Sequence, residues 1–339
     1  MIERIDELPW LETQWERLIE RWTLGRLPHA LLFEGRNGIG KSPLAGLLAK
    51  RLVCEGTERG TAPCGRCKQC ELVAAASHPD IRTYRPEDSR VIKVDQVRAL
   101  GEFAVASPQV ARHKVIILDS ADRLNINSAN ALLKTLEEPS PDVTLILLQQ
   151  AGKPLLPTIR SRCQSVLLPG PDADTAADWL ASALAQRPES EPVDVALQAR
   201  ALRLANGAPL LARDYIDDGF VGGVEACLNS FRQFLKSRLA PEEATKPFVK
   251  LGLENSLGLM ERWAADLARL GVGGEPEDPE VADILSYLAT HNPPHRVHGI
   301  LGDIAEARAG LTYNVNPDLE IERLLLAWLT FMPRKQRAG

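Results

Sequence analysis

The chain has 339 residues, of which 45% are hydrophobic and 25% charged, and its formal net charge is −5. At roughly 100 to 200 residues per domain, this length predicts two or three folded domains. The negative balance disfavours a protein that wraps nucleic acid through its overall charge. No run approaches the roughly 18 to 20 apolar residues that span a bilayer, and the first residues do not resemble a secretion signal. We therefore expect a cytoplasmic protein with no membrane partner.

Short β-rich apolar runs alternate with helical patterns through the first half of the chain. After a helical opening at residues 11–22, such runs predict strands at residues 30–33, 81–84, 115–118, 144–148 and 166–168. Helices are predicted at residues 44–52, 94–106 and 129–136. Strands that alternate with helices predict an α/β domain whose parallel sheet is covered on both faces.

From residue 172 onward the strand pattern ends, and amphipathic helical stretches predict an all-α second half. The Pro-Gly-Pro segment at 169–171 marks one domain boundary, and the Asp- and Gly-rich segment at 214–223 marks a weaker one. We therefore divide the chain into residues 1–168, 169–213 and 214–339. Near the C-terminus, residues 317–331 have a broad apolar helical face that fits core packing better than an interface.

Residues 35–42 match the phosphate-binding pattern G-x-x-x-x-G-K-[ST], directly after a predicted strand and directly before a predicted helix. Gly35, Gly38 and Gly40 would let backbone N–H groups surround phosphate oxygens at a helix N-terminus. Lys41 would reach the outer phosphates of ATP, and the Ser42 hydroxyl would bind Mg²⁺. A glycine-rich turn without a ligand is the alternative.

Residues near this pattern weaken the case for ATP hydrolysis. Pro43 lacks the backbone N–H that would face the nucleotide, although proline suits the first turn of a helix. Asp119 follows a buried-strand run and is a candidate ligand in the magnesium shell. The alternative is that it only ends the strand and binds nothing. Ser120 stands where a motor ATPase carries a glutamate that orients water, and a hydroxyl is a poor base. We expect ATP and Mg²⁺ binding to be weak or absent, without hydrolysis.

Four of the six cysteines crowd into residues 54–70 with the spacing C-x9-C-x2-C-x2-C. They are Cys54, Cys64, Cys67 and Cys70. In a reducing compartment this crowding indicates metal binding before disulfides. Four thiolates, with Gly65 in a tight turn, suit a tetrahedral Zn²⁺ of structural role, because they leave no open coordination position. A redox C-x-x-C pair is the alternative. Cys163 and Cys227 stand alone, and the sequence does not indicate what roles they have.

Arg160 and Arg162 lie together in the short segment 158–163, after the predicted strand at 144–148. A solvated basic turn is the simpler interpretation. Arginine is nevertheless permanently charged and can neutralise phosphate through two parallel hydrogen bonds. An arginine at a subunit edge can thereby complete the nucleotide site of a neighbour.

Together these features resemble the bacterial clamp-loader family of AAA+ proteins, which includes delta-prime and gamma/tau types. The resemblance spans most of the chain. It is carried by residues 27–33 (LPHALLF), the four-cysteine insert, 77–80 (SHPD), 129–139 (ANALLKTLEEP) and 161–163 (SRC). It implies an AAA+ parallel-sheet core with a zinc module, a small helical lid domain and a C-terminal helical collar. It also implies that Arg162 is an arginine finger that acts in the ATP site of the adjacent subunit.

The resemblance further implies partners and a role in DNA replication. The chain would join gamma/tau and delta subunits in a hetero-pentamer that loads the sliding clamp onto primed DNA, as part of the DNA polymerase III holoenzyme. Nothing in it resembles a polymerase active site. Pro43, Ser120 and Leu210 depart from the ATP-hydrolysing pattern of the family, Leu210 standing where a lid arginine is expected after Gly207. Gln149-Gln150 departs more weakly, standing where motor subunits carry a threonine that senses the phosphate. They favour a delta-prime-like subunit over a gamma/tau-like motor. An autonomous ATPase and a zinc-module nucleic-acid binder are the alternatives.

Overall fold

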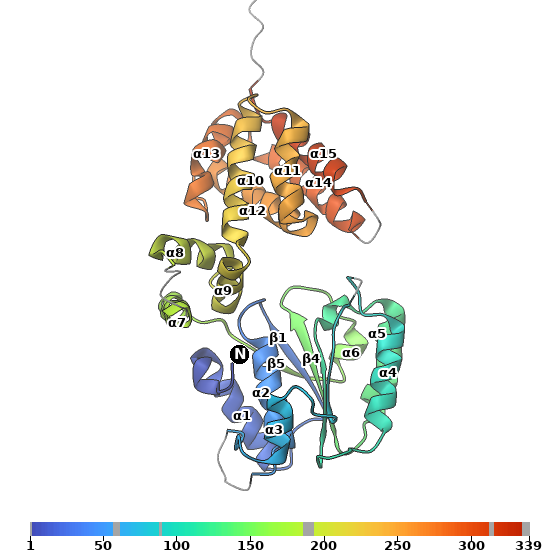
Figure 1. Cartoon of the computed structure of the whole chain (residues 1–339). Helices are drawn as coiled ribbons and strands as arrows, with labels where there is room; N and C mark the ends of the chain where they lie inside the picture. The colour runs from blue at the N-terminus through green and yellow to red at the C-terminus, as the bar shows by residue number, and fades with distance from the viewer. Residues whose placement is uncertain (1, 57–61, 88–89, 186–192, 312–314, 334–339) are drawn as a thin grey trace, which may run out of the picture. The chain divides into compact units, whose positions relative to one another are not determined.

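The computed structural model describes residues 2–56, 62–87, 90–185, 193–311 and 315–333 (Figure 1). The chain forms two compact units. The first comprises Met1–Asp178 and Gly207–Leu211, and the second comprises Trp179–Asn206 and Ala212–Gly339. None of the described helices is both long enough and apolar enough to cross a membrane.

Five parallel strands form the sheet of the first unit, in the order β2-β3-β4-β1-β5. They are β1 (Ala30–Gly35), β2 (Ile81–Tyr84), β3 (Lys114–Leu118), β4 (Val143–Gln150) and β5 (Gln164–Leu167). In the central strand β4, Leu147 pairs with Leu32 of β1, and Leu145 pairs with Ile116 of β3. Nearly all residues of β1, β3 and β4 are buried, as expected for parallel strands that are covered on both faces.

Helices cover this sheet from both sides. Those that precede β5 are α1 (Glu12–Thr23), α2 (Lys41–Val53), α3 (Lys68–Ala74), α4 (Val94–Val105), α5 (Ile126–Glu137) and α6 (Pro157–Arg160). The helices α4 and α5 pack side by side, and their buried residues form one cluster with Leu32, Ile116 and Leu145 of the sheet. Since successive strand residues point to opposite faces, the neighbouring residues of these strands face the other side, where α2 contacts β1, β3 and β4.

The predicted elements of the first half are confirmed, with shifts at their ends. The predicted strand 81–84 coincides with β2, and the predicted strand 144–148 lies within β4. The predicted strand 166–168 lies partly beyond β5, which starts at Gln164 and is mostly exposed. An exposed edge strand lacks the apolar pattern by which the buried strands are recognised.

All the secondary-structure elements that the structure describes in the second unit are helices. Its helices include α8 (Val195–Leu204), α10 (Phe220–Leu235), α11 (Pro241–Leu251), α12 (Leu253–Gly271), α13 (Ala282–His291), α14 (Val297–Gly310) and α15 (Pro317–Leu329). The helices α7 (Ala173–Ala185) and α9 (Pro209–Asp217) contribute residues to both units. The all-α prediction is confirmed, whereas the predicted boundaries after residues 168 and 213 stay predictions.

Aromatic rings form the centre of the second unit. The ring of Phe231 on α10 lies 4.8 Å from that of Trp263 on α12 and 5.2 Å from that of Trp328 on α15, measured between centroids. All three side chains are buried. Trp328 packs into this cluster, and Ile321, Leu324 and Leu325 are buried as well, so this part of the apolar face of α15 is core, as its sequence predicts. Leu319 and Leu326 are exposed.

Candidate functional site

The predicted phosphate loop connects β1 to α2 at the carboxyl end of the strand. Gly38 and Gly40 have φ angles of 73° and 102°, which glycine adopts without steric cost. Gly40 is the N-cap of α2, so that Lys41 and Ser42 are its first residues and Pro43 follows in the same turn. The loop thus presents the N-terminus of a helix, the position at which backbone N–H groups bind phosphate.

Lys41 folds back onto this loop. Its Nζ donates hydrogen bonds to the carbonyl oxygens of Gly35, at 2.8 Å, and Arg36, at 2.7 Å. Burial lowers the pKa of Lys41 to about 8, while the carboxylates of Asp119 and Asp122 act in the opposite direction. The structure therefore brings the motif lysine and Asp119 to one edge of the sheet. It adds Asp122, which the sequence motif did not indicate.

Asp119 directly follows β3, and β4 lies between β3 and β1 in the sheet. Its backbone N–H donates to the carbonyl of Tyr84 at 2.8 Å. Ser120 has a φ angle of 66°, a left-handed conformation that is uncommon outside glycine. Its Oγ lies 3.5 Å from Oδ1 of Asp119. Ser120 therefore sits at the expected place beside the carboxylate but offers no carboxylate of its own to accept a proton from water.

The N-terminal segment packs against the phosphate loop. The indole Nε1 of Trp10 donates a hydrogen bond of 2.8 Å to the carbonyl of Ile39. A Cβ atom at Gly40 would meet side-chain carbons of Leu8 at 3.1 Å and of Leu11 at 3.2 Å. The φ angle of Gly40 favours glycine, and a larger residue would also require small shifts of Leu8 and Leu11.

Residues Gly207–Leu211 pack against the same loop. The backbone N–H of Leu210 donates to the carbonyl of Gly38 at 3.1 Å, and a Cβ atom at Gly38 would lie 2.6 Å from the backbone nitrogen of Leu211. The side chain of Leu210 is buried. Leu210 stands where the resemblance leads us to expect an arginine. Its side chain is apolar, so this position offers no positive charge to the loop.

Arg160 and Arg162 have different partners. Arg160 forms an ion pair of 2.7 Å between its NH1 and Oε2 of Glu34, and its NH2 donates to Oε1 of Gln149 at 2.9 Å. Both terminal nitrogens of Arg160 are therefore held by residues of β1 and β4. Its charge thus lies against the edge of its own sheet.

Arg162 lies just beyond α6. Its NH2 is 2.6 Å from Oε1 of Glu137, the last residue of α5, and its NH1 donates to the carbonyl of Thr158 at 3.0 Å. The side chain is 36% exposed. Arg162 is therefore held in a defined position at the end of α5, while the side chain of Arg160 is also partly exposed, at 45%.

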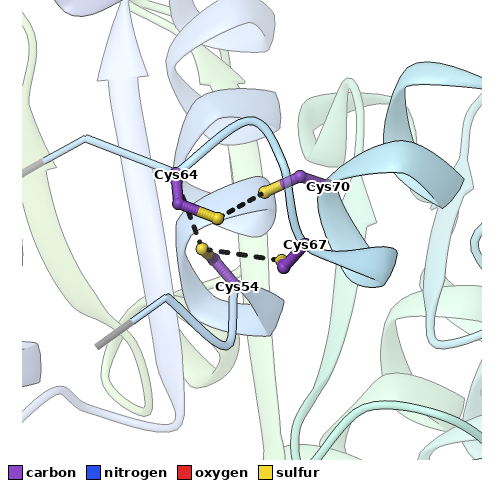
Figure 2. A group of neighbouring side chains, drawn as sticks. All are labelled: Cys54, Cys64, Cys67 and Cys70. Carbon is purple, nitrogen blue, oxygen red and sulfur yellow. Dashed lines mark hydrogen bonds between the residues drawn. The ribbon is translucent and has the colours of Figure 1, made fainter. Parts of the chain in front are cut away.

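The four predicted cysteines lie together (Figure 2). Their sulfur atoms are all within 4.8 Å of one another, and the pairs Cys64–Cys70 and Cys54–Cys67 are each separated by 4.0 Å. Zn–S bonds of about 2.3 Å in a tetrahedron separate the sulfurs by about 3.8 Å. No disulfide joins them. The cluster therefore has nearly the dimensions of a four-thiolate zinc site.

The backbone around the cluster also suits thiolates. The N–H groups of Gly56 and Cys64 point at the sulfur of Cys54, at 3.4 and 3.3 Å. A Cβ atom at Gly56 would lie 2.7 Å from that of Cys64, so that only glycine allows this close packing. Gly65 has a φ angle of 71°, in agreement with the tight turn predicted there.

The thiols of the cluster differ in acidity. The backbone N–H of Arg66 lowers the pKa of Cys64 to about 6, whereas burial raises the pKa of Cys70 to about 12. All four groups can be thiolates together only beside a cation that offsets their charge. The residues fit a structural Zn²⁺, which four thiolates would enclose without an open position.

A hydrogen-bond network extends from the cysteine module to the start of β3. The buried Gln69 of α3 bonds to Nε2 of His78 at 2.9 Å, and Nδ1 of His78 accepts the backbone N–H of Asp80 at 3.1 Å. The fully buried carboxylate of Asp80 accepts the N–H groups of residues 109–111 at 2.7 to 2.8 Å. Because both ring nitrogens of His78 are engaged in this network, His78 is not a further ligand of the cluster.

A parallel sheet with a phosphate loop after β1, an aspartate after β3 and helices beyond the last strand defines the AAA+ class of proteins. Within this class, the family described as "DNA polymerase III, delta subunit" matches residues 10–172. The DNA polymerase III subunit delta' of Pseudomonas aeruginosa is 33% identical over 95% of this chain and 97% of its own length. That of Escherichia coli K12 is 31% identical over 94% of each chain.

The chain belongs to the family of DNA polymerase III delta' subunits, which are clamp-loader subunits. The clamp-loader resemblance of the sequence is thereby confirmed. Among solved structures, a gamma subunit-related protein of DNA polymerase III from Thermotoga maritima covers 96% of this chain and 100% of its own, with a TM-score of 0.43 and 17% identity.

Sequence reasoning did not find several residues that shape these sites. Trp10, Gln69 and Glu137 bond to residues far away in the chain, and no motif spacing indicates such contacts. Asp122 acts on the remote Lys41 through its charge. Only Glu137 left a local signal. Glu137 is the last residue of α5 and Glu138 is its C-cap, where the helix dipole favours basic residues.

Proposed function

We propose that this chain is a largely non-hydrolytic assembly subunit of the clamp loader, which donates Arg162 to the ATP site of a neighbouring subunit. The observation that carries the proposal is the position of Arg162 in the matching segment 161–163, where it lies just beyond α6, pairs with Glu137 at the end of α5 and is 36% exposed. Arg160 pairs instead with Glu34 and Gln149 of the sheet. An arginine finger stabilises the charge that develops on the transferred phosphoryl group.

The chain's own phosphate loop supports weak nucleotide binding at most. Its glycine conformations and Lys41 suit phosphate, but Pro43 removes one N–H donor from the first turn of α2. Ser120 replaces the expected base, and Leu210 brings no charge to the loop. Gln149, at the position of a phosphate-sensing threonine, is already bonded to Arg160. These features favour binding of ATP and Mg²⁺ without turnover, or no binding.

In this proposal the chain works inside a hetero-pentamer with gamma/tau and delta subunits. Residues 1–168 are the AAA+ domain, 169–213 the helical lid and 214–339 the collar through which the ring assembles. The complex would contact the sliding clamp and primed DNA and would load the clamp during replication. The chain itself adds no nucleotides to DNA, although it serves the polymerase holoenzyme. A structural Zn²⁺ on Cys54, Cys64, Cys67 and Cys70 holds the module at residues 54–70.

A gamma/tau-like motor that hydrolyses ATP is the second candidate. The intact pattern from Gly35 to Ser42 favours it, because Lys41 and the helix N-terminus stand where a working loop needs them. Sub-micromolar affinity of the isolated chain for ATP and Mg²⁺, measured by isothermal titration, would support this candidate and contradict a vestigial loop.

The decisive experiment measures the DNA-stimulated ATPase rate of a reconstituted clamp loader that contains this chain. We expect Arg162→Ala to leave assembly intact and to slow hydrolysis at the site that it completes by about 10³- to 10⁵-fold. The other sites of the ring supply the residual rate. Lys41→Ala should change the rate little, because this loop does not turn over ATP.

Each other outcome has a definite meaning. An intact complex with an unchanged rate for Arg162→Ala would remove the finger role. A large loss with Lys41→Ala alone would show that the chain is itself a motor and that Ser120 does not prevent hydrolysis.

A further inference from the structure

Arg162 is not a freely rotating side chain. Its NH2 lies 2.6 Å from Oε1 of Glu137 on α5, and its NH1 donates to the carbonyl of Thr158 in α6 at 3.0 Å. Two separate helices therefore hold the two ends of one guanidinium. The side chain is still 36% exposed, and that of Glu137 is 49% exposed, so this pair lies at the surface.

Glu137 occupies an unfavourable position for a carboxylate. It is the last residue of α5, where the partial negative charge of the helix end repels acidic groups and attracts basic ones. The guanidinium of Arg162 compensates both the carboxylate and the helix end. Departures from a local sequence preference are expected where a residue serves function, and Glu137 is such a departure with an identified partner.

The ion pair leaves Arg162 able to bind a further anion. A guanidinium carries five N–H donors in a planar fork. Each terminal nitrogen has two N–H groups and is held through one partner, so that one N–H on each terminal nitrogen and the Nε–H remain for phosphate oxygens. The contact with Glu137 can therefore persist while the other donors face a nucleotide on the neighbouring subunit.

We propose that Glu137 is a positioning residue that pre-orients Arg162 for the ATP site of the adjacent subunit. This inference rests on the finger role proposed above. An unpaired arginine must lose its rotamer freedom when it meets the phosphate, whereas one already fixed by Glu137 loses less. Glu137 should therefore affect the rate of hydrolysis and not the binding of ATP, since only the transition state uses the finger fully.

The test uses the reconstituted clamp loader and replaces Glu137→Gln, which keeps the size of the side chain and removes its charge. The adjacent substitution Glu138→Gln is the matched control, because Glu138 is exposed and forms no ion pair with any described residue. The share of the DNA-stimulated rate that depends on Arg162 is defined by comparison with Arg162→Ala. Gel filtration checks that each complex assembles.

We expect Glu137→Gln to remove about half to nine-tenths of the Arg162-dependent rate, the two- to tenfold effect of ordering one long side chain. The KM for ATP should stay within about twofold of wild type, and Glu138→Gln should behave as wild type. The double variant Arg162→Ala/Glu137→Gln should be no slower than Arg162→Ala alone, because Glu137 acts only through Arg162.

An unchanged hydrolysis rate for Glu137→Gln would overturn the positioning role. A raised rate would also overturn it, because Glu137 would then keep Arg162 away from the neighbouring site. A double variant slower than Arg162→Ala would also overturn it, since Glu137 would then act by another route. These results are distinct from failure of the proposed function. If Arg162→Ala itself has no effect, the finger role is lost. If Arg162→Ala slows hydrolysis but Glu137→Gln has no effect, Arg162 remains the finger and Glu137 does not position it.

Discussion

Arg160 and Arg162 carry the same side chain two residues apart, and their neighbours alone separate their roles. Arg160 holds Glu34 and Gln149 at the edge of the sheet, whereas Arg162 is held by Glu137 at the end of α5. Each guanidinium has two contacts within the chain, so the place of these contacts, at the sheet edge or at the end of α5, distinguishes the two arginines. At the residue scale, function follows from which partner each charge already has.

His113 is a residue whose environment predicts a dependence of stability on pH. It lies next to β3, bonds through Nε2 to Oγ1 of Thr144 at 2.8 Å and contacts the ring of Trp22 edge-on at 5.2 Å. Burial lowers its pKa, while the carboxylate of Asp142 acts in the opposite direction. The folded chain therefore binds a proton at His113 less readily than the unfolded chain does.

We expect the free energy of unfolding to fall as the pH drops below about 6.5, the ordinary histidine pKa. In that range the unfolded state takes up a proton that the folded state refuses, so stability declines at up to about 1.4 kcal/mol per pH unit for this group. In His113→Gln the decline between pH 7.5 and 5.5 should be smaller. Urea unfolding at several pH values measures it.

His298→Gln is the control for this prediction, because His298 is exposed on α14. It should keep the full decline of wild type. His78, whose pKa burial also lowers, remains in all three proteins and contributes equally. Equal pH dependence in wild type and His113→Gln would contradict the prediction.

At the element scale, α3 depends on the cysteine cluster. It has only two turns, Lys68–Ala74, and it is capped by Cys67 and carries Cys70 in its first turn. Isolated helices of this length are unstable in water. The remaining thiols belong to Cys54, which directly follows α2, and to Cys64. A metal ion would therefore hold α3 to the end of α2.

We expect the purified wild-type chain to contain about one zinc ion. Cys67→Ser should lose most of it, because three thiolates bind the ion less tightly and leave a position open to water. Hydrogen exchange should accelerate in α3 of this variant. Elemental analysis by mass spectrometry gives the stoichiometry, and hydrogen-exchange mass spectrometry gives the protection.

Cys163→Ser makes the same chemical change outside the cluster and should keep the full zinc content. The thiol of Cys163 is not among the four clustered sulfurs, and burial raises its pKa to about 11. A metal-free wild-type protein, or a Cys67→Ser variant with unchanged zinc, would show that the cluster is not a zinc site.

At the scale of the whole molecule, each of the two units has its own core. The first is built on the five-stranded sheet, and the second on helices around Phe231, Trp263 and Trp328. A chain with separate cores is not expected to unfold in a single two-state step. A substitution in one core should therefore destabilise the unit that contains it before it affects the other unit.

We expect Trp328→Ala to destabilise the second unit by about 3 to 5 kcal/mol, because it leaves a cavity beside Phe231. Hydrogen exchange should accelerate in α10, α12 and α15, while the cysteine module keeps its zinc. Leu326→Ala on the same helix is the control. Leu326 is 44% exposed, and its loss should change stability by less than about 0.5 kcal/mol. Equal effects of both substitutions would contradict the assigned core.

Much of the fold could be predicted because its signals are local. The strands β1, β3 and β4 are continuous apolar runs, and the helices of the second unit show regular amphipathic spacing. The strand β5 was less well placed, since its residues are mostly exposed. All four members of the cysteine cluster could be predicted, because three of them lie within seven consecutive residues, 64–70.

By itself, the sequence determined the phosphate loop, the cysteine cluster and the order of α/β and helical halves, because each depends on residues that are close together in the chain. Only the tertiary structure decided which distant residues meet. It placed Leu211 against Gly38 and paired Arg162 with Glu137. Such contacts arise when strand pairing and helix packing bring remote segments together, and no local pattern specifies their distance. The partner of each charge, and with it the proposed role of Arg162, follows from that packing.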